Sequence, residues 1–207
     1  MCNSCDRPLF FGLLGLGLCL LLAVSCGSTG SSTALAPSND TPIWQLLQRN
    51  PVGYVVMMRH AEAPGVGDPS PFRLDDCSTQ RNLSPEGRAQ AQRIGQGFRQ
   101  RKISIAQVFS SQWCRCLETA RLLQLGQVQP LPALNSFFQS RRTEPQQSAA
   151  VRQLIIKHRH TPGVLLLITH QVNITAISGT VPPSGGSVVL KANDRGAIDV
   201  IGQLPPE

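Results

Sequence analysis

Arginine and histidine side chains stand at the points where two apolar segments of the chain end. Arg59 and His60 directly follow residues 54–58, and His170 lies two residues after residues 164–168. An arginine offers a planar fork of N–H donors to phosphate oxygens, and a histidine can attack phosphorus covalently. These residue types indicate chemistry on an anion, most simply a phosphoryl group.

The elements that must position these side chains follow an alternating order along the chain. A buried parallel strand is typically a continuous run of aliphatic residues, and both apolar segments have that pattern. After a short helix at 43–47 we expect strand, loop, helix, strand, helix, strand, helix, strand, helix and two final strands. This alternation predicts an α/β fold, a three-layer sandwich with a mainly parallel sheet and helices on both faces. The expected strands are 53–58, 103–109, 128–131, 164–168, 187–191 and 197–201.

The predicted sheet also indicates where a ligand would bind. Ligands of open α/β sheets bind at the carboxyl ends of the strands, which is where Arg59 and His60 lie. A loop of about 20 residues then leaves this edge, and loops of that length without regular structure are commonly functional. We expect it to cover the site.

Composition limits the classes of partner. The chain has 207 residues, a net charge of +7, 15% charged residues and 5% aromatic residues. It has no lysine-rich tract, and aromatic residues for base stacking are few, so we expect a small anionic substrate and no nucleic-acid partner. The oligomeric state cannot be read from these features.

The N-terminal region has the pattern of a targeting segment. Residues 1–26 contain a short basic region and an apolar stretch at 9–24, shorter than a membrane span. The end of this stretch, Ala-Val-Ser-Cys-Gly, resembles a bacterial lipobox with Cys26 as the lipid-modified residue; the alternative is an ordinary cleaved signal. Residues 27–42 are expected to be a flexible tether and 43–207 the folded domain, so the protein would be extracytoplasmic and membrane-anchored.

Four motifs occur in one order and resemble the fingerprint of the histidine phosphatase superfamily, which includes phosphoglycerate mutase and the acid phosphatases. They extend over about residues 52–178. The motifs are Arg59-His60-Ala61, Leu83 to Gly87 (Leu-Ser-Pro-Glu-Gly), Ser110 to Ala120 (Ser-Ser-Gln-Trp-Cys-Arg-Cys-Leu-Glu-Thr-Ala) and Thr169-His170. The resemblance implies a phosphoglycerate mutase-like fold and a phosphatase that uses neither metal nor cofactor.

The resemblance also implies a role for each motif residue. His60 is expected to be the nucleophile that becomes phosphohistidine, with Arg59, Arg115 and His170 holding the phosphoryl oxygens. Asn173, in the His-Gln-Val-Asn sequence, is expected to contact substrate. Ala61 replaces the usual glycine, which is tolerable if its φ is negative.

The general acid is the weakest part of the match. The region 133–138 has no carboxylate, and Gln171 stands where a related branch has aspartate. Glu62, two residues after His60, is the best-placed candidate, and the others are Asp68, Asp75, Asp76 and Glu144. Without an acid, the chain would be a phosphate- or phosphoester-binding lipoprotein with little turnover. A mutase is a separate alternative, and it would need a phosphorylated cofactor, which is not expected outside the cytoplasm.

Three cysteines lie outside the N-terminal segment. An extracytoplasmic location permits a disulfide, and we expect Cys77 to bond Cys114 or Cys116. The Cys-x-Cys spacing without a nearby pair of histidine ligands is poor for zinc.

Overall fold

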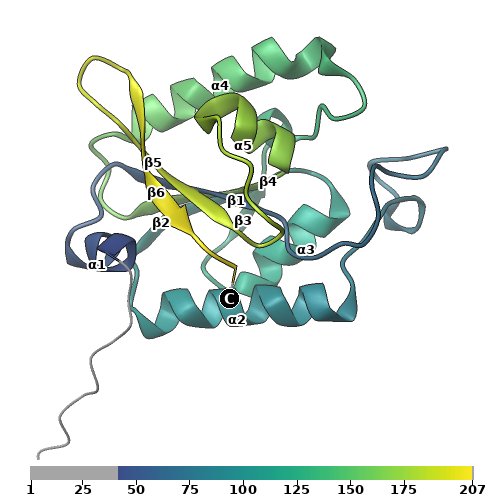
Figure 1. Ribbon diagram of the computed structural model, residues 1–207, viewed down its shortest axis with the longest axis horizontal. Helices are drawn as coiled ribbons and strands as arrows, with labels where there is room; N and C mark the ends of the chain where they lie inside the picture. Colours follow the sequence, from purple (N-terminus) through teal and green to yellow (C-terminus); the bar gives the residue numbers. More distant parts are fainter. Residues whose placement is uncertain (1–41, 207) are drawn as a thin grey trace, which may run out of the picture. The chain divides into compact units, whose positions relative to one another are not determined.

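Six strands form one mainly parallel sheet in the computed structural model, which describes residues 42–206. The strand order is β3-β2-β4-β1-β5-β6 (Figure 1). The first four of these are parallel, and β5 pairs antiparallel with both β1 and β6. This confirms the predicted fold class. The strands are β1 (Tyr54–Arg59), β2 (Ile105–Ser110), β3 (Val128–Pro130), β4 (Val164–Thr169), β5 (Ser187–Ala192) and β6 (Ile198–Leu204).

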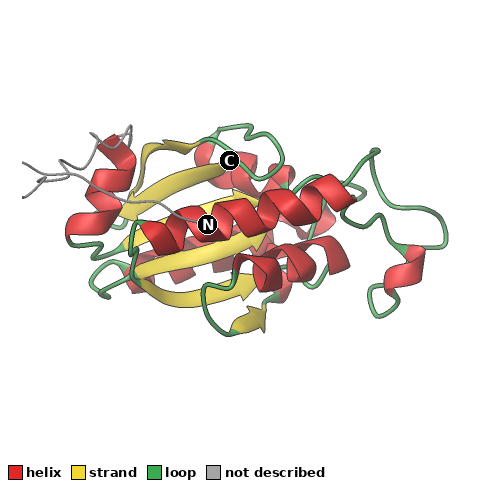
Figure 2. Ribbon diagram, turned by 90° about the horizontal axis from the view of Figure 1, so that it is seen from below, coloured by secondary structure: helices red, strands yellow, loops and turns green. Residues whose placement is uncertain are grey.

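Helices cover both faces of the sheet (Figures 1 and 2). Successive strand side chains point to opposite faces, so Val56 and Met58 of β1 pack into one core and Val55 and Met57 into the other. Burial on both faces explains why this strand is apolar without alternation. The first core is covered by α1 (Pro42–Arg49), α2 (Pro85–Gln100) and α3 (Cys114–Leu123), and the second by α4 (Glu144–His158) and α5 (Gln171–Ser178).

The start of α2 follows from its sequence. Ser84 accepts a hydrogen bond from the Gly87 N–H, and Pro85 is the first helical residue. A β-carbon at Gly87 would overlap the carbonyl oxygen of Glu62, so the motif glycine lets α2 pack directly on the backbone that follows His60.

Residues 61–83, the covering loop, connect β1 to α2 and project from the carboxyl edge of the sheet (Figure 1). Their only regular element is the short 3-10 helix Cys77–Thr79. The predicted long loop is therefore confirmed.

The N-terminal predictions lie outside the described residues. These are the targeting segment 1–26 with Cys26 and the tether up to residue 41. Within 42–206 no helix has both the length and the apolar character needed to cross a membrane.

Candidate active site

The side chains that follow β1 and β4 meet in one cavity of about 180 Å³. Parallel pairing places Arg59, the last residue of β1, opposite Thr169, the last residue of β4. His60 and His170 are therefore the first residues after these two strands. Their ring centroids are 5.5 Å apart. Arg115, from the first turn of α3, lines the same cavity. The structure therefore brings together the two imidazoles and two guanidiniums singled out from the sequence.

His60 is buried and held in one tautomer. Its Nδ1 lies 2.8 Å from the carbonyl oxygen of Ala61, and because a carbonyl only accepts, Nδ1 carries the hydrogen. Nε2 is left with its lone pair. Burial, and then the positive charge of Arg115, lower the pKa of His60 to about 3, so the ring is neutral at pH 7. A neutral imidazole with a free Nε2 lone pair can act as a nucleophile.

The backbone after His60 is fixed by α3. The Ala61 N–H donates to Thr119 Oγ1 at 3.1 Å, and that hydroxyl donates to the Arg115 carbonyl at 2.7 Å. Ala61 is not among the described non-glycine residues with positive φ, so its methyl group causes no backbone strain. The threonine of the third motif therefore positions the nucleophile.

His170 is buried between Ser111 and Arg115. Its Nε2 lies 2.9 Å from Ser111 Oγ, and its Nδ1 lies 3.5 Å from Nη2 of Arg115. Burial, and then the neighbouring His60, hold the pKa of His170 well below its ordinary value. The serine that closes the strand end of β2 thus orients the second histidine.

Two guanidinium N–H groups at the cavity have no acceptor. Nε of Arg59 and Nε of Arg115 are both buried without a hydrogen-bond partner, although Nη1 of Arg59 donates to the Pro182 carbonyl at 3.1 Å. An unpaired buried donor is costly and calls for an explanation. An oxyanion in the cavity would supply the missing acceptors.

Asp68 is the only carboxylate among the described residues that line the cavity. Its two oxygens accept from Nη1 and Nη2 of Arg115 at 2.7 and 3.2 Å, and further bonds come from Trp113 Nε1 and the Arg81 N–H. Burial alone would raise the pKa of Asp68, but its bonds with Arg115, together with those from Arg81 and Trp113, outweigh this effect and lower it. Asp68 is therefore an ionised partner of Arg115.

Two expected site residues do not line the cavity. Glu62 is exposed, and its backbone forms hydrogen bonds with Gln90 and Ser84. Burial lowers the pKa of Arg59, and the charge of the nearby Glu62 carboxylate partly opposes this. Asn173 is buried and donates to the Asn135 carbonyl at 2.9 Å. The expectation that Glu62 supplies the acid, and that Asn173 contacts substrate, therefore finds no support in the geometry, because the turn after His60 directs one outward and α5 encloses the other.

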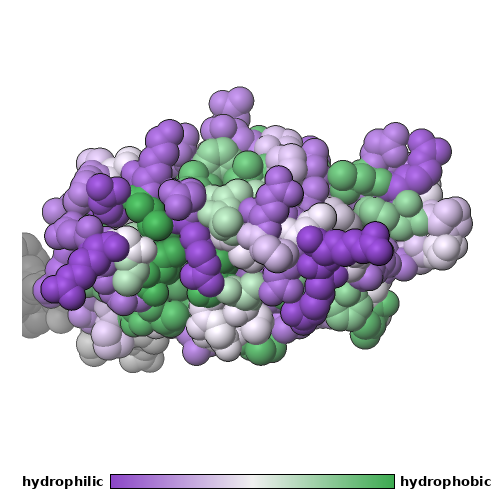
Figure 3. Space-filling model, turned by 90° about the horizontal axis from the view of Figure 1, so that it is seen from above, coloured by the Kyte–Doolittle hydropathy of each residue, from purple (hydrophilic) through white to green (hydrophobic). Residues whose placement is uncertain are grey.

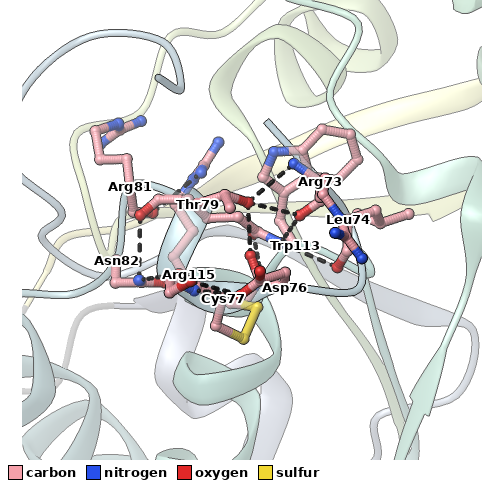
Figure 4. The surroundings of a disulfide bond; sticks show 12 residues. Arg73, Leu74, Asp76, Cys77, Thr79, Arg81, Asn82, Trp113 and Arg115 are labelled. Atoms are coloured by element: carbon pink, nitrogen blue, oxygen red, sulfur yellow. Dashed lines mark hydrogen bonds between the residues drawn. A yellow bond between two sulfur atoms is a disulfide. The ribbon is translucent and has the colours of Figure 1, made fainter. Parts of the chain in front are cut away.

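The disulfide joins Cys77 to Cys114, as one of the two expected pairings (Figure 4). It ties the covering loop to the first residue of α3, next to Arg115. Cys116 is free but fully buried, and burial raises the pKa of its thiol to about 12. The thiol is therefore unreactive.

Arg81 is a cavity residue that the motifs did not identify. Its Nε donates to the Gly67 carbonyl at 2.8 Å, and Nη1 donates to the Ala63 carbonyl. The feature of the sequence that could have identified Arg81 is its position, two residues before the Leu83 motif and in the loop that leaves the carboxyl edge of the sheet. No group of three potential metal-binding side chains occurs within residues 42–206.

Known proteins share this architecture. SixA, a protein histidine phosphatase solved with tungstate, is 18% identical over 74% of this chain and 97% of its own, with a TM-score of 0.52. A second SixA, from Agrobacterium tumefaciens, gives 20% identity, the same coverage and a TM-score of 0.51. Phosphoserine phosphatase from Entamoeba histolytica, solved with 3-phosphoglyceric acid, is 13% identical over 74% of this chain and 98% of its own, with a TM-score of 0.53. These identities establish the fold alone.

At the level of sequence, a comparison with the curated proteins gave no match. One family model does match, over residues 55–137, which include three of the four motifs. That model is the histidine phosphatase superfamily (branch 1), and the fold of the chain is the one seen in the solved phosphatases of that type.

Proposed function

We propose that this chain is a histidine phosphatase, a phosphomonoester hydrolase that works through a phosphohistidine on His60 without a metal. The observation that carries the proposal is the neutral His60 ring, fixed through Nδ1, among cationic side chains with unpartnered Nε–H groups. Phosphoryl transfer depends mainly on positioning and on positive charge around the three equatorial oxygens. Arg59 and Arg115 supply both.

The reaction would proceed in two displacements. The Nε2 lone pair of His60 attacks phosphorus, and the bond from phosphorus to the leaving oxygen breaks with its electron pair on that oxygen. Water then attacks the phosphohistidine, the phosphorus–nitrogen bond breaks, and the electron pair returns to Nε2 as phosphate leaves. Nδ1 of His170 faces the Arg115 guanidinium, which can only donate, so Nδ1 accepts and Nε2 carries the ring hydrogen and donates it to Ser111 Oγ. The hydroxyl hydrogen of Ser111 goes to Asn135 Oδ1. His170 would thereby hold Arg115 in place for the phosphoryl group.

Solved structures with the same fold support an anionic ligand for this chain. SixA carries tungstate, a tetrahedral oxyanion, and the Entamoeba phosphatase carries a phosphorylated small molecule. A phosphorylated small molecule is accordingly the proposed partner of this chain.

The proposed location is outside the cytoplasm, with a lipid on Cys26. The lipobox-like sequence supports it, and the Cys77–Cys114 disulfide fits an oxidising compartment. The test is fractionation of cells expressing the full chain: Cys26→Ser should move the protein from the membrane fraction to the soluble one. Retention of the variant in the membrane would contradict the anchor.

The experiment for the mechanism is trapping of the intermediate. Labelled p-nitrophenyl phosphate, quenched during turnover, should give an acid-labile adduct that maps to His60. His60→Ala should abolish it, and His160→Ala, which removes an exposed histidine, should not. A label on another residue would overturn the mechanism. No phosphate release with retained vanadate binding would instead favour the binding lipoprotein.

A further inference from the structure

The mouth of the cavity differs in character from its floor. The ionisable residues that line the cavity are here called the floor residues, and they are Arg59, His60, Asp68, Arg81, Arg115 and His170. The other lining residues are uncharged, and they are Gly65, Val66, Gly67, Trp113, Ser136, Phe138, Gln139, Gln171 and Val172. All charges of the lining therefore belong to the floor residues, which suit the phosphoryl end of a substrate.

Apolar side chains at this mouth are unusually exposed. Val66 is 87% and Phe138 56% exposed, and they are two of only four large hydrophobic residues exposed in the described part of the chain. Hydrophobic residues are visible among hydrophilic ones at the end of the molecule where the covering loop projects (Figure 3). Because both side chains also line the cavity, an apolar part of a ligand bound there would cover them.

Trp113 forms a fixed aromatic wall beside the two histidines. Its ring stacks on Phe72 with centroids 5.0 Å apart, and it meets His170 edge-on at 5.4 Å. The indole N–H is bonded to Asp68 at 3.0 Å, which prevents rotation of the ring. A flat ring entering the cavity would gain aromatic contacts without ordering this side chain.

The floor offers no proton to a departing oxygen. Its single carboxylate, Asp68, already accepts four hydrogen bonds, two of them from Arg115. Glu62 does not line the cavity. A leaving group must therefore depart as an anion. A phenol does so far more readily than an alkanol, because phenols ionise near pH 10, as tyrosine does, whereas water ionises near 15.7.

We infer that the substrates of this site are aryl phosphates, phosphomonoesters of an uncharged aromatic alcohol. The ring would lie between Trp113 and the Val66 and Phe138 side chains, with the phosphoryl group on the cationic floor. The cavity volume of about 180 Å³ is of the scale that holds one ring, since roughly 150 Å³ accommodates benzene. The inference rests on the proposed function.

The leaving-group part is tested with phenyl and benzyl phosphate. Both carry the same ring, but only phenyl phosphate releases a phenol. General acid catalysis contributes about 10²–10⁴-fold, so kcat/KM for benzyl phosphate should be lower by about that factor. Asp68→Asn should leave the ratio unchanged. Equal rates, or a selective loss of benzyl phosphate hydrolysis in Asp68→Asn, would show a working acid and overturn the inference.

The ring part is tested by binding, which needs no turnover. Phenylphosphonate and methylphosphonate have phosphorus–carbon bonds that the proposed reaction cannot break. Phenylphosphonate should bind about tenfold more tightly by calorimetry, and Phe138→Ala or Val66→Ala should reduce that preference several-fold. Val200→Ala, which removes an exposed valine on β6, is the matched control.

These experiments distinguish failure of the aryl phosphate inference from failure of the proposed phosphohistidine mechanism. Equal affinities for the two phosphonates would overturn the aryl class even if phosphohistidine forms on His60. A clear preference for phenylphosphonate without any phosphohistidine would refute the proposed mechanism while the ring contact stands.

Discussion

Two sides of the cavity are built in different ways: the sheet wall, formed by the residues at the ends of β1 and β4, and the loop wall, formed by the covering loop. On the sheet side, backbone bonds hold the functional residues: the His60 N–H donates to the Thr169 carbonyl, and the Arg59 N–H donates to the Gly186 carbonyl, both at 3.0 Å. On the other side, the covering loop has one turn of 3-10 helix and is held by side-chain bonds and the Cys77–Cys114 disulfide.

The two walls also carry different charges. The sheet wall supplies the nucleophile and Arg59, whereas the covering loop supplies Asp68, Arg81 and part of the neutral mouth. The parallel strands fix reacting groups to the accuracy that phosphoryl transfer requires, and the loop decides which anion and which leaving group reach them. Chemistry and selection can therefore be disturbed separately.

Arg115→Ala should have the largest effect, because Arg115 connects the walls. Loss of one preorganised donor group costs about 10²–10³-fold in rate, and here two terminal nitrogens and Nε are removed, so we expect about 10³-fold in kcat/KM with p-nitrophenyl phosphate. The variant also leaves Asp68 buried without its partner, which should cost about 3–5 kcal/mol in unfolding free energy.

Adding Asp68→Asn to the Arg115→Ala variant separates the loss of activity from the loss of stability. The double variant should recover most of the stability lost by Arg115→Ala, measured by urea unfolding, but none of the activity. Recovery of both would mean that Arg115 acts only by holding the loop.

Removal of the disulfide should disturb the loop wall selectively. A cross-link between residues separated by 37 positions is expected to stabilise the fold by about 3–4 kcal/mol. Cys77→Ser should lose that amount in urea unfolding yet retain phosphohistidine formation. Wild-type protein in excess reductant should behave in the same way, and reductant should not affect the variant. A loss of the adduct would show that the sheet wall depends on the loop.

The sheet wall could be predicted from the sequence because local pattern and topology suffice there. Uninterrupted aliphatic runs indicated β1 and β4, and parallel strands end at one edge of a sheet, so His60 and His170 were expected at the same edge. That the two strands are direct neighbours is seen only in the structure. The roles of Ser111 and Thr119 in the third motif could not be predicted. The sequence pattern does not show that Ser111 contacts His170 or that Thr119 contacts Ala61.

The loop wall could not be predicted because its contacts are nonlocal and lack periodicity. Asp68 lies 47 residues from Arg115, and nothing in the Gly-Asp-Pro sequence distinguishes it from the exposed Asp75. Proximity in sequence favoured Glu62, which the structure directs to solvent. The disulfide partner of Cys77 was narrowed to two cysteines, since residues 114 and 116 lie within one turn of α3.

Acid should weaken the fold through the sheet wall. Because the pKa of His60 falls to about 3, the unfolded chain binds a proton below about pH 6.5 that the native chain refuses. Stability is therefore full above pH 6.5 and is lost as the pH falls towards 3. Between pH 7 and 5 the unfolding free energy should drop by on the order of 2 kcal/mol from this group. His60→Gln should reduce the dependence, with the remainder coming from the buried His170, and an unchanged slope would contradict the assignment.

Asp68→Asn should give the smallest effect and the sharpest comparison of the walls. The carboxylate occupies both terminal nitrogens of Arg115 and repels an incoming phosphate dianion. The amide retains its shape and one acceptor, so the loop should stay in place while the anion is lost. Inorganic phosphate should then inhibit several-fold more strongly. Asp75→Asn removes an exposed carboxylate from the same loop and should leave phosphate inhibition unchanged. If both variants tightened phosphate binding equally, net charge would be responsible, and the pairing of Asp68 with Arg115 would not control access to the site.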